Sequence, residues 1–197
     1  PRALDLSLAA EVGVVLAGPN GAGKTTAVLG LLGALRPSHG ACVIDDVPAC
    51  DLEPGALAGA IGYVPQDPLV MPGETLAWHC RLHEDASDAV IDEALTASGL
   101  TETLASRARA RGVAVRDLPA GELSGGERRK LALARALQRD RALYVFDEPE
   151  AGLDAEARAS LRALLERLAT RARVLVVVHD RHTAPSSFAE VLLPSRQ

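Results

Sequence analysis

The chain has 197 residues, of which 48% are hydrophobic and 24% charged, and its formal net charge is −5. This length fits one globular domain with room for an inserted subdomain. The negative charge gives no sign of a nucleic-acid partner, and no apolar run approaches the roughly 20 residues of a membrane-spanning helix.

Short apolar runs alternate with helical patterns along the chain. In chain order we expect a strand at 12–17, a helix at 24–35, strands at 41–44 and 61–64, helical segments within 75–109, a helix at 124–138, a strand at 142–146, a helix at 155–170, a strand at 173–178 and a last short strand at 191–193. Strands that alternate with helices indicate a parallel sheet covered on both faces, so the expected fold class is α/β.

The middle of the chain differs from the rest. Residues 67–122 contain no good strand pattern, and their helical pattern breaks near Asp85 and Gly99. We therefore expect a helical subdomain at 67–122, inserted into a core made of residues 1–66 and 123–197. The group His79, Cys80 and His83 is better explained as a helical surface than as a metal site, because no fourth ligand has a suitable spacing.

A glycine-rich stretch follows the first expected strand and leads into the first expected helix. Residues 18–26 read GPNGAGKTT and fit the pattern G-x-x-x-x-G-K-[ST]. In such a loop the backbone N–H groups surround phosphate, and the helix N-terminus adds roughly half a positive charge. Lys24 is expected to reach the β- and γ-phosphates and Thr25 to bind Mg²⁺. No N-K-x-D element is present, which disfavours GTP.

Acidic and imidazole side chains follow two of the expected strands. Asp147 and Glu148 end the apolar run 142–146, and His179 directly follows the run 173–178. Ligands gather at the carboxyl ends of parallel strands. With the phosphate loop on a neighbouring strand, we expect Asp147 to face the Mg²⁺ and Glu148 to polarise an attacking water. His179 is placed to hydrogen-bond the γ-phosphate.

Two adjacent glycines stand at the start of the helix expected at 124–138. Gly125 and Gly126 cost roughly 1 kcal/mol each inside a helix, so they need a reason. One explanation is a loop that requires positive φ, and the other is a ligand that approaches the bare backbone. Ser124 and Glu127 have the Ser-x-x-Glu spacing of a capping box, so we expect Glu127 to hold the helix start rather than to touch nucleotide.

These motifs together resemble the nucleotide-binding domain of ATP-binding cassette (ABC) proteins over nearly the whole chain. The stretch 18–26 resembles the Walker A loop, Gln66 the glutamine of the Q-loop, and LSGGE at 123–127 the LSGGQ signature. Residues 143–148 resemble Walker B, residues 151–154 the D-loop, and His179 the switch histidine. The resemblance implies a P-loop NTPase fold with a helical subdomain.

The resemblance also implies which residues form the site. Nucleotide binding would fall to Asn20, Gly21, Ala22, Gly23, Lys24, Thr25 and Thr26, with Ser124, Gly125, Gly126 and Asp154. Catalysis would fall to Glu148, His179 and Gln66. Mg²⁺ would be bound by Thr25, Gln66 and Asp147. The cofactors are therefore expected to be ATP and Mg²⁺.

The partners implied by the resemblance are a second ABC domain and a transmembrane domain. The two ABC domains would form a head-to-tail homo- or heterodimer, in which the Walker A loop of one subunit faces the signature of the other. The transmembrane domain would lie in the same chain or in a separate subunit, which places this domain at the cytoplasmic face of the cell membrane. The stretch VPQDPLVMPGETLAWHCRL is similar to exporter-type sequences, although Trp78 and His79 replace their E-N pair. No nucleic-acid partner is expected.

Two other functions remain as alternatives. A soluble ABC ATPase without a membrane partner is one, although the insert is too short and lacks the heptads of a repair factor. A P-loop nucleotide kinase is the other, and it would need an acceptor site and a lid that the sequence does not indicate.

Three features depart from the family pattern. The chain starts at Pro1 and its only methionine is Met71, so we expect a piece of a longer polypeptide. No aromatic residue precedes Tyr63, and a stacked base contributes about 1–3 kcal/mol, so this piece should bind ATP weakly. Glu150 occupies a position where the family usually has Thr or Ser, and we expect it to point into solvent.

Overall fold

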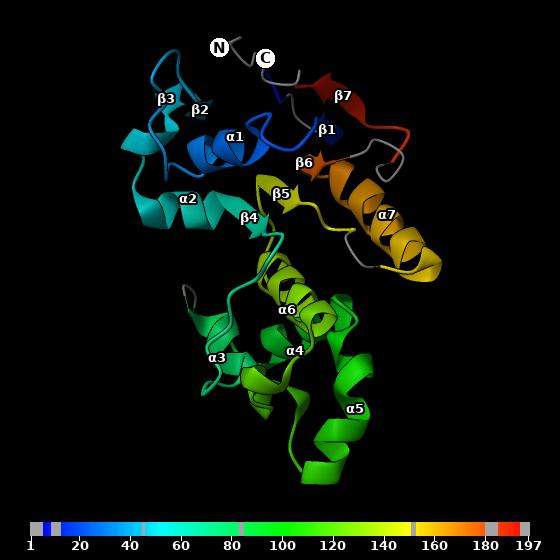
Figure 1. Ribbon diagram of the computed structural model, residues 1–197. Helices are drawn as coiled ribbons and strands as arrows, with labels where there is room; N and C mark the ends of the chain where they lie inside the picture. The colour runs from blue at the N-terminus through cyan, green and yellow to red at the C-terminus, as the bar shows by residue number, and fades with distance from the viewer. Residues whose placement is uncertain are drawn as a thin grey trace. The chain divides into compact units, whose positions relative to one another are not determined.

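The computed structural model describes residues 6–8, 13–44, 46–82, 85–150, 153–179 and 185–193. The chain forms two compact units (Figure 1). The first consists of Pro1–Ile61 and Arg141–Gln197, and the second of Gly62–Asp140. In the part of the chain that the structure describes, no helix has the length and apolar character needed to cross a bilayer.

The first unit contains a parallel sheet. Its strands are β1 (Gly13–Ala17), β5 (Leu143–Asp147), β6 (Arg173–Val178) and β7 (Ala189–Leu192). The order of the sheet is β4-β5-β6-β1-β7. The edge strand β4 (Ile61–Val64) begins at Ile61, the residue at which the N-terminal part of the first unit ends. β6 lies parallel to both β5 and β1, and β1 lies parallel to β7. Every residue of β1 and β5 is buried, as the apolar runs predict.

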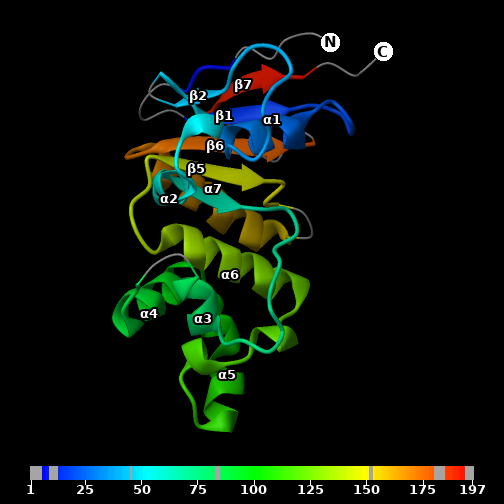
Figure 2. The same ribbon diagram turned by 90° about the vertical axis from the view of Figure 1, so that its left-hand side faces the viewer.

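Helices cover both faces of this sheet. The first unit contributes α1 (Lys24–Leu31), α2 (Pro54–Ala60) and α7 (Ala155–Ala169). Figures 1 and 2 show α1 and α7 on opposite faces. α7 buries Leu164, Leu165 and Leu168, and each fully buried leucine stabilises the fold by about 1.5–3 kcal/mol. The expected α/β class, with a mainly parallel sheet flanked by helices, is confirmed.

Three local elements differ from the expected ones. The helix expected at 24–35 ends at Leu31, because Gly33 takes a φ of 70° that a helix cannot continue. The strand expected at 41–44 is reduced to β2 (Val43–Ile44), which pairs antiparallel with β3 (Val47–Pro48) in a separate hairpin. A 3₁₀ turn (Ala49–Asp51) follows the hairpin.

The second unit is helical. Its elements are α3 (Leu76–Arg81), α4 (Asp88–Ala97), α5 (Leu100–Arg111), the 3₁₀ turns Val115–Asp117 and Ala120–Glu122, and α6 (Gly125–Leu137). The break expected near Gly99 is confirmed. Gly99 lies between α4 and α5 in the left-handed conformation, with a φ of 72°. The side chains of Thr75 and Ser87 cap α3 and α4.

The helix α6 belongs to this helical unit by its packing. Its residues Leu131 and Ala134 are buried in one apolar cluster with residues of α3, α4 and α5, among them Leu76, Leu95 and Leu104. The unit at 62–140 is therefore longer at both ends than the subdomain expected at 67–122. At the C-terminal end, the physical reason is that the apolar face of α6 is buried among these helices.

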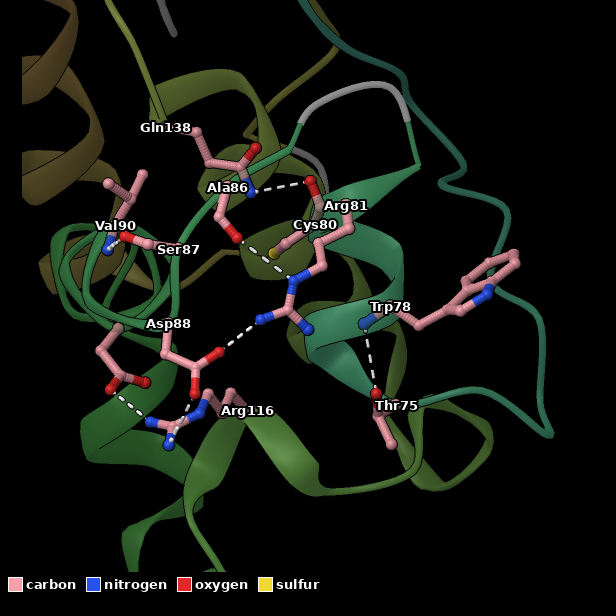
Figure 3. A network of polar contacts seen from close by, with 11 residues as sticks. Thr75, Trp78, Cys80, Arg81, Ala86, Ser87, Asp88, Val90, Arg116 and Gln138 are labelled. Carbon is pink, nitrogen blue, oxygen red and sulfur yellow. Dashed lines mark hydrogen bonds and ion pairs between the residues drawn. The ribbon is translucent and has the colours of Figure 1, made fainter.

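Polar contacts join the surface of the same helices (Figure 3). Arg81 of α3 forms an ion pair with Asp88 of α4, and Arg116 pairs with Asp88 at 3.2 Å and with Asp92. The carbonyl of Cys80 accepts a hydrogen bond from Gln138 Nε2 at 3.0 Å. Exposed ion pairs contribute about 0–1 kcal/mol each, so the apolar cluster supplies most of the stability of this unit.

Candidate functional site

The glycine-rich loop joins β1 to α1. Gly21 and Gly23 have φ angles of 78° and 103°, a region that side chains other than glycine rarely adopt. A Cβ atom built at either position would meet nothing within 4 Å. The Ala22 N–H donates to the Pro19 carbonyl at 3.1 Å and closes the turn. The loop therefore presents bare backbone in the conformation that a phosphate-binding loop requires.

Lys24 is held inside this loop. Its side chain is buried, and Nζ donates to the carbonyl oxygens of Gly18 at 2.6 Å and Pro19 at 3.3 Å. The ammonium group thus lies within the curve of the loop, where the motif predicts phosphate groups. Thr25 and Thr26 follow in the first turn of α1, and both are exposed.

Acidic residues reach the same edge of the sheet. Asp147 ends β5 opposite Val177 of β6, and the next residue of β6 pairs with Ala17, which precedes the phosphate loop. Three neighbouring strands therefore end at nearly the same level of the sheet. The phosphate loop follows the end of β1, Asp147 and Glu148 stand at the end of β5, and His179 follows the end of β6. The expectation that the loop and the acids lie on neighbouring strands is wrong, because β6 runs between β1 and β5.

Glu148 has an unusual backbone. Its φ is 47°, and its N–H donates to the Val177 carbonyl at 2.9 Å. A left-handed conformation at a residue other than glycine costs about 1–3 kcal/mol and is found most often at functional sites. The hydrogen bond to β6 holds the residue in this conformation at the sheet edge.

Glu150 does not point into solvent as expected. It is only 7% exposed, and its carbonyl accepts a hydrogen bond from Leu153 N–H at 3.1 Å. Glu150 lies in the turn that follows β5, and tertiary packing around this turn buries it, which is the physical reason for the difference.

The start of α6 in the second unit is a capping box. The Ser124 Oγ accepts from the Glu127 N–H at 3.3 Å, and Glu127 Oε2 accepts from the Ser124 N–H at 2.8 Å. The expectation that Glu127 holds the helix start is confirmed.

The capping box predicts that the stability of the fold depends on pH. Burial raises the pKa of Glu127, but the hydrogen bonds from Ser124 and the charge of Arg107 outweigh burial and hold this pKa below its ordinary value. A lowered pKa contributes stability that is present above the pKa of the unfolded chain and is lost as the pH falls through the lowered value. We expect thermal denaturation of wild type and Glu127→Gln to differ near neutral pH and to converge in this acidic range. A difference that stays constant with pH would contradict the assignment.

Gly125 and Gly126 lie in the first turn of α6, and both are exposed. Neither is among the residues with positive φ, and a Cβ built at either would meet nothing within 4 Å. The explanation that the pair supplies positive φ is therefore wrong. Within the described residues, neither backbone conformation nor packing requires glycine at these two positions.

Gln66 lies in the same unit. It is exposed, and its carbonyl accepts a hydrogen bond from Arg129 Nε of α6 at 3.3 Å. The segment around Gln66 therefore contacts the helix that begins with the glycine pair.

Asp154 acts as a helix cap. Its Oδ1 accepts from the Ala157 N–H at 2.8 Å at the start of α7. This role was missed in the sequence, although an Asp directly before a helical pattern is a common start signal. Residues 151 and 152 of the expected D-loop lie outside the described residues.

His79 is not part of a helical surface. It is 1% exposed, Nε2 accepts from the Met71 N–H at 2.8 Å, and Nδ1 lies 2.8 Å from the Thr75 carbonyl. Because Nε2 accepts, Nδ1 carries the proton and donates it. Both ring nitrogens are satisfied by backbone, which allows the ring to be buried. His83 lies outside the described residues.

The predicted site residues thus fall into two groups. The first unit holds Asn20, Gly21, Ala22, Gly23, Lys24, Thr25, Thr26, Asp147, Glu148, Asp154 and His179. The second unit holds Gln66, Ser124, Gly125 and Gly126. A parallel sheet with a G-x-x-x-x-G-K-T loop after β1 and acids after β5 defines the class as a P-loop nucleotide-binding domain.

The comparison with protein families agrees with this class. The family model described as ABC transporter matches residues 2–151. The chain therefore belongs to the ABC transporter family, and it corresponds to the ATP-binding domain of that family.

Similar proteins include a flippase and an ATP-binding protein of zinc import. An ATP-dependent lipid A-core flippase from Burkholderia orbicola (strain AU 1054) is 34% identical over 170 residues, which cover 86% of this chain and 28% of the flippase. The zinc import ATP-binding protein ZnuC from Yersinia pestis is 36% identical over 195 residues, which cover 95% of this chain and 68% of that protein.

A similar solved structure is a bacterial Atm1-family ABC exporter with ATP bound. It aligns with a TM-score of 0.83 and 27% identity, covering 94% of this chain and 32% of the exporter chain. The chain thus spans about a third or less of the flippase and of this exporter.

Proposed function

We propose that this chain is the ATP-binding and ATP-hydrolysing domain of a membrane transporter of the exporter type, and that it works in a head-to-tail dimer with a second ABC domain. Family membership, the flippase relative and the exporter structure support this proposal. A further relative, a beta-(1-->2)glucan export ATP-binding/permease protein from Nitrobacter winogradskyi, is 36% identical over 93% of this chain and 30% of its own length.

The phosphate loop would hold the nucleotide. The backbone N–H groups of residues 20–26 and the Lys24 ammonium are the donors for the phosphate oxygens. Asp147 at the end of β5 and the exposed Thr25 hydroxyl fit a Mg²⁺ ion, which usually takes one or two carboxylates together with substrate phosphates. Bound Mg²⁺ would offset charge on those phosphates, and Gln66 is proposed as a further ligand.

Residues at the sheet edge would carry out hydrolysis. The Glu148 carboxylate would polarise a water molecule for attack on the γ-phosphate. His179 follows β6 directly and is exposed, so its imidazole is available to hydrogen-bond the γ-phosphate. Gln66 is the third residue proposed for catalysis.

The glycine pair at the start of α6 is the single observation that most supports the proposed dimer. Gly125 and Gly126 leave the start of α6 open, and the positive end of that helix attracts an anion. This chain has its own phosphate loop at 18–26, so the anion at α6 is proposed to be the terminal phosphate of a nucleotide held by the partner subunit. Ser124 would donate its hydroxyl proton to that phosphate while its oxygen caps the helix.

Exposed apolar side chains support a membrane partner. Leu69 is 82% exposed, Met71 49% and Trp78 37%, all within twelve residues after Gln66. Figure 3 shows the Trp78 indole pointing away from the neighbouring polar contacts. Large apolar side chains exposed in one segment favour a protein partner. We propose that this partner is the transmembrane domain, which places the chain at the cytoplasmic face of the membrane.

Import is the second candidate direction. The zinc import relative favours it, because it is 36% identical over 95% of this chain. With the whole transporter in vesicles, export predicts that substrate leaves the compartment that holds this domain. Import predicts the opposite movement.

The ATPase proposal is tested with Lys24→Ala. We expect wild type to hydrolyse ATP only with Mg²⁺ and to form dimers with ATP, as measured by phosphate release and light scattering. The variant removes the cation inside the phosphate loop, so nucleotide binding should fall by at least about tenfold, because charged hydrogen bonds contribute about 1.5–3 kcal/mol each. The control is Arg36→Ala, which removes an exposed cation beyond α1 that pairs with Asp51. Equal binding by Lys24→Ala and wild type would contradict the site.

A further inference from the structure

Arg107 of α5 reaches the capping box of α6. Its Nη2 donates to Glu127 Oε1 at 3.2 Å, and the other carboxylate oxygen accepts the Ser124 N–H at 2.8 Å. The Glu127 side chain is 11% exposed and that of Arg107 35%. One oxygen of this partly buried carboxylate thus belongs to the helix cap, and the other pairs with a cation on another helix.

The charge of Glu127 has two opposite effects at this place. An ionised acid in the first turn stabilises a helix, but it also cancels the positive field that the helix end offers to an anion outside. The neighbouring cations of α6 make their bonds elsewhere: Arg128 Nε donates to the Leu123 carbonyl, and Lys130 Nζ donates to Gly99 and Thr103. Arg107 is the cation that the structure pairs with Glu127.

We propose that Arg107 is a positioning residue for the phosphate-facing start of α6. It fixes the Glu127 carboxylate in the capping box and offsets its negative charge, so that residues 124–126 remain attractive to a terminal phosphate. This inference rests on the proposed function, because the phosphate is that of a nucleotide on the partner subunit.

The test compares Arg107→Gln, Glu127→Gln and the double variant in the whole chain. Arg107→Gln leaves the carboxylate charge without its offset, so we expect the apparent KM for ATP and the ATP concentration needed for dimerisation to rise about two- to fivefold, with little change in kcat. The double variant should return close to wild type. The neutral amide that replaces the Glu127 carboxylate needs no offset, and its oxygen still accepts the Ser124 N–H.

The matched control is Arg111→Gln. Arg111 lies on the same helix and forms an exposed ion pair with Glu122 at 2.7 Å, away from the capping box, so its loss should leave KM unchanged. A double variant as impaired as Arg107→Gln, or an equal effect of Arg111→Gln, would overturn the charge offset and leave Arg107 a merely structural role.

A second measurement needs no nucleotide. The pKa of Glu127, followed by carboxyl-carbon NMR, should rise in Arg107→Gln relative to wild type, and an unchanged pKa would refute the pairing. If wild type neither hydrolyses ATP nor dimerises with it, the proposed function fails, while this titration still decides whether Arg107 controls Glu127.

Discussion

Glu148→Gln will retain ATP binding and lose nearly all hydrolysis. The amide keeps the size of the side chain but cannot polarise a water molecule, and such general-base help contributes about 10²–10⁴-fold. Because ATP binding closes the proposed dimer and hydrolysis opens it, ATP-bound dimers should accumulate. Phosphate release measures the loss of hydrolysis, and light scattering with ATP measures the accumulation of dimers.

The neighbouring acid supplies the control for this prediction. Glu150→Gln changes a carboxylate two residues away that is buried in the turn after β5, and it should slow hydrolysis far less. Normal turnover in Glu148→Gln would refute the assigned role, and equal losses in both variants would point to a shared structural cause.

Gly126→Ala will make the protein more stable and less active. Alanine in place of glycine favours a helix by about 0.5–1 kcal/mol, and the new methyl group would meet no atom of this chain within 4 Å. The same methyl group would stand between the helix start and the proposed phosphate of the partner subunit, and a displacement of about 1 Å can cost on the order of 100-fold in rate. Thermal denaturation and ATP hydrolysis measure the two effects.

Gly55→Ala is the matched control. Gly55 lies within α2, and its added Cβ also meets nothing within 4 Å. It should gain similar stability with unchanged activity. Full activity in Gly126→Ala would show that no ligand approaches the glycine pair.

Local patterns in the sequence predicted most of the fold. The helix expected at 124–138 agrees with α6 to within one residue at each end, and the Ser-x-x-Glu spacing predicted its capping box. These features depend on hydrogen bonds between residues a few positions apart, so the sequence contains them directly. The second helix, α2, was missed because its sequence PGALAGA is short, and only the proline in its first turn marked it.

Features that depend on distant parts of the chain were predicted less well. The burial of His79 and Glu150 is decided by tertiary packing, which no local pattern contains. The position of β6 between β1 and β5 is a property of the sheet order, so the loop and the acids were placed on adjacent strands. The candidate residues themselves could be chosen because each follows a recognisable strand or begins a recognisable helix.

The packing of α6 has a mechanical consequence. Gln66 and the glycine pair belong to the same compact unit, and Arg129 joins the Gln66 carbonyl to α6. A rotation of this unit as a rigid body would move Gln66 and the glycine pair together. A force on the segment after Gln66 would then displace the start of α6 without successive side-chain rearrangements. If the proposed function holds, the proposed membrane contact and the proposed phosphate contact therefore lie on one compact unit and would move together.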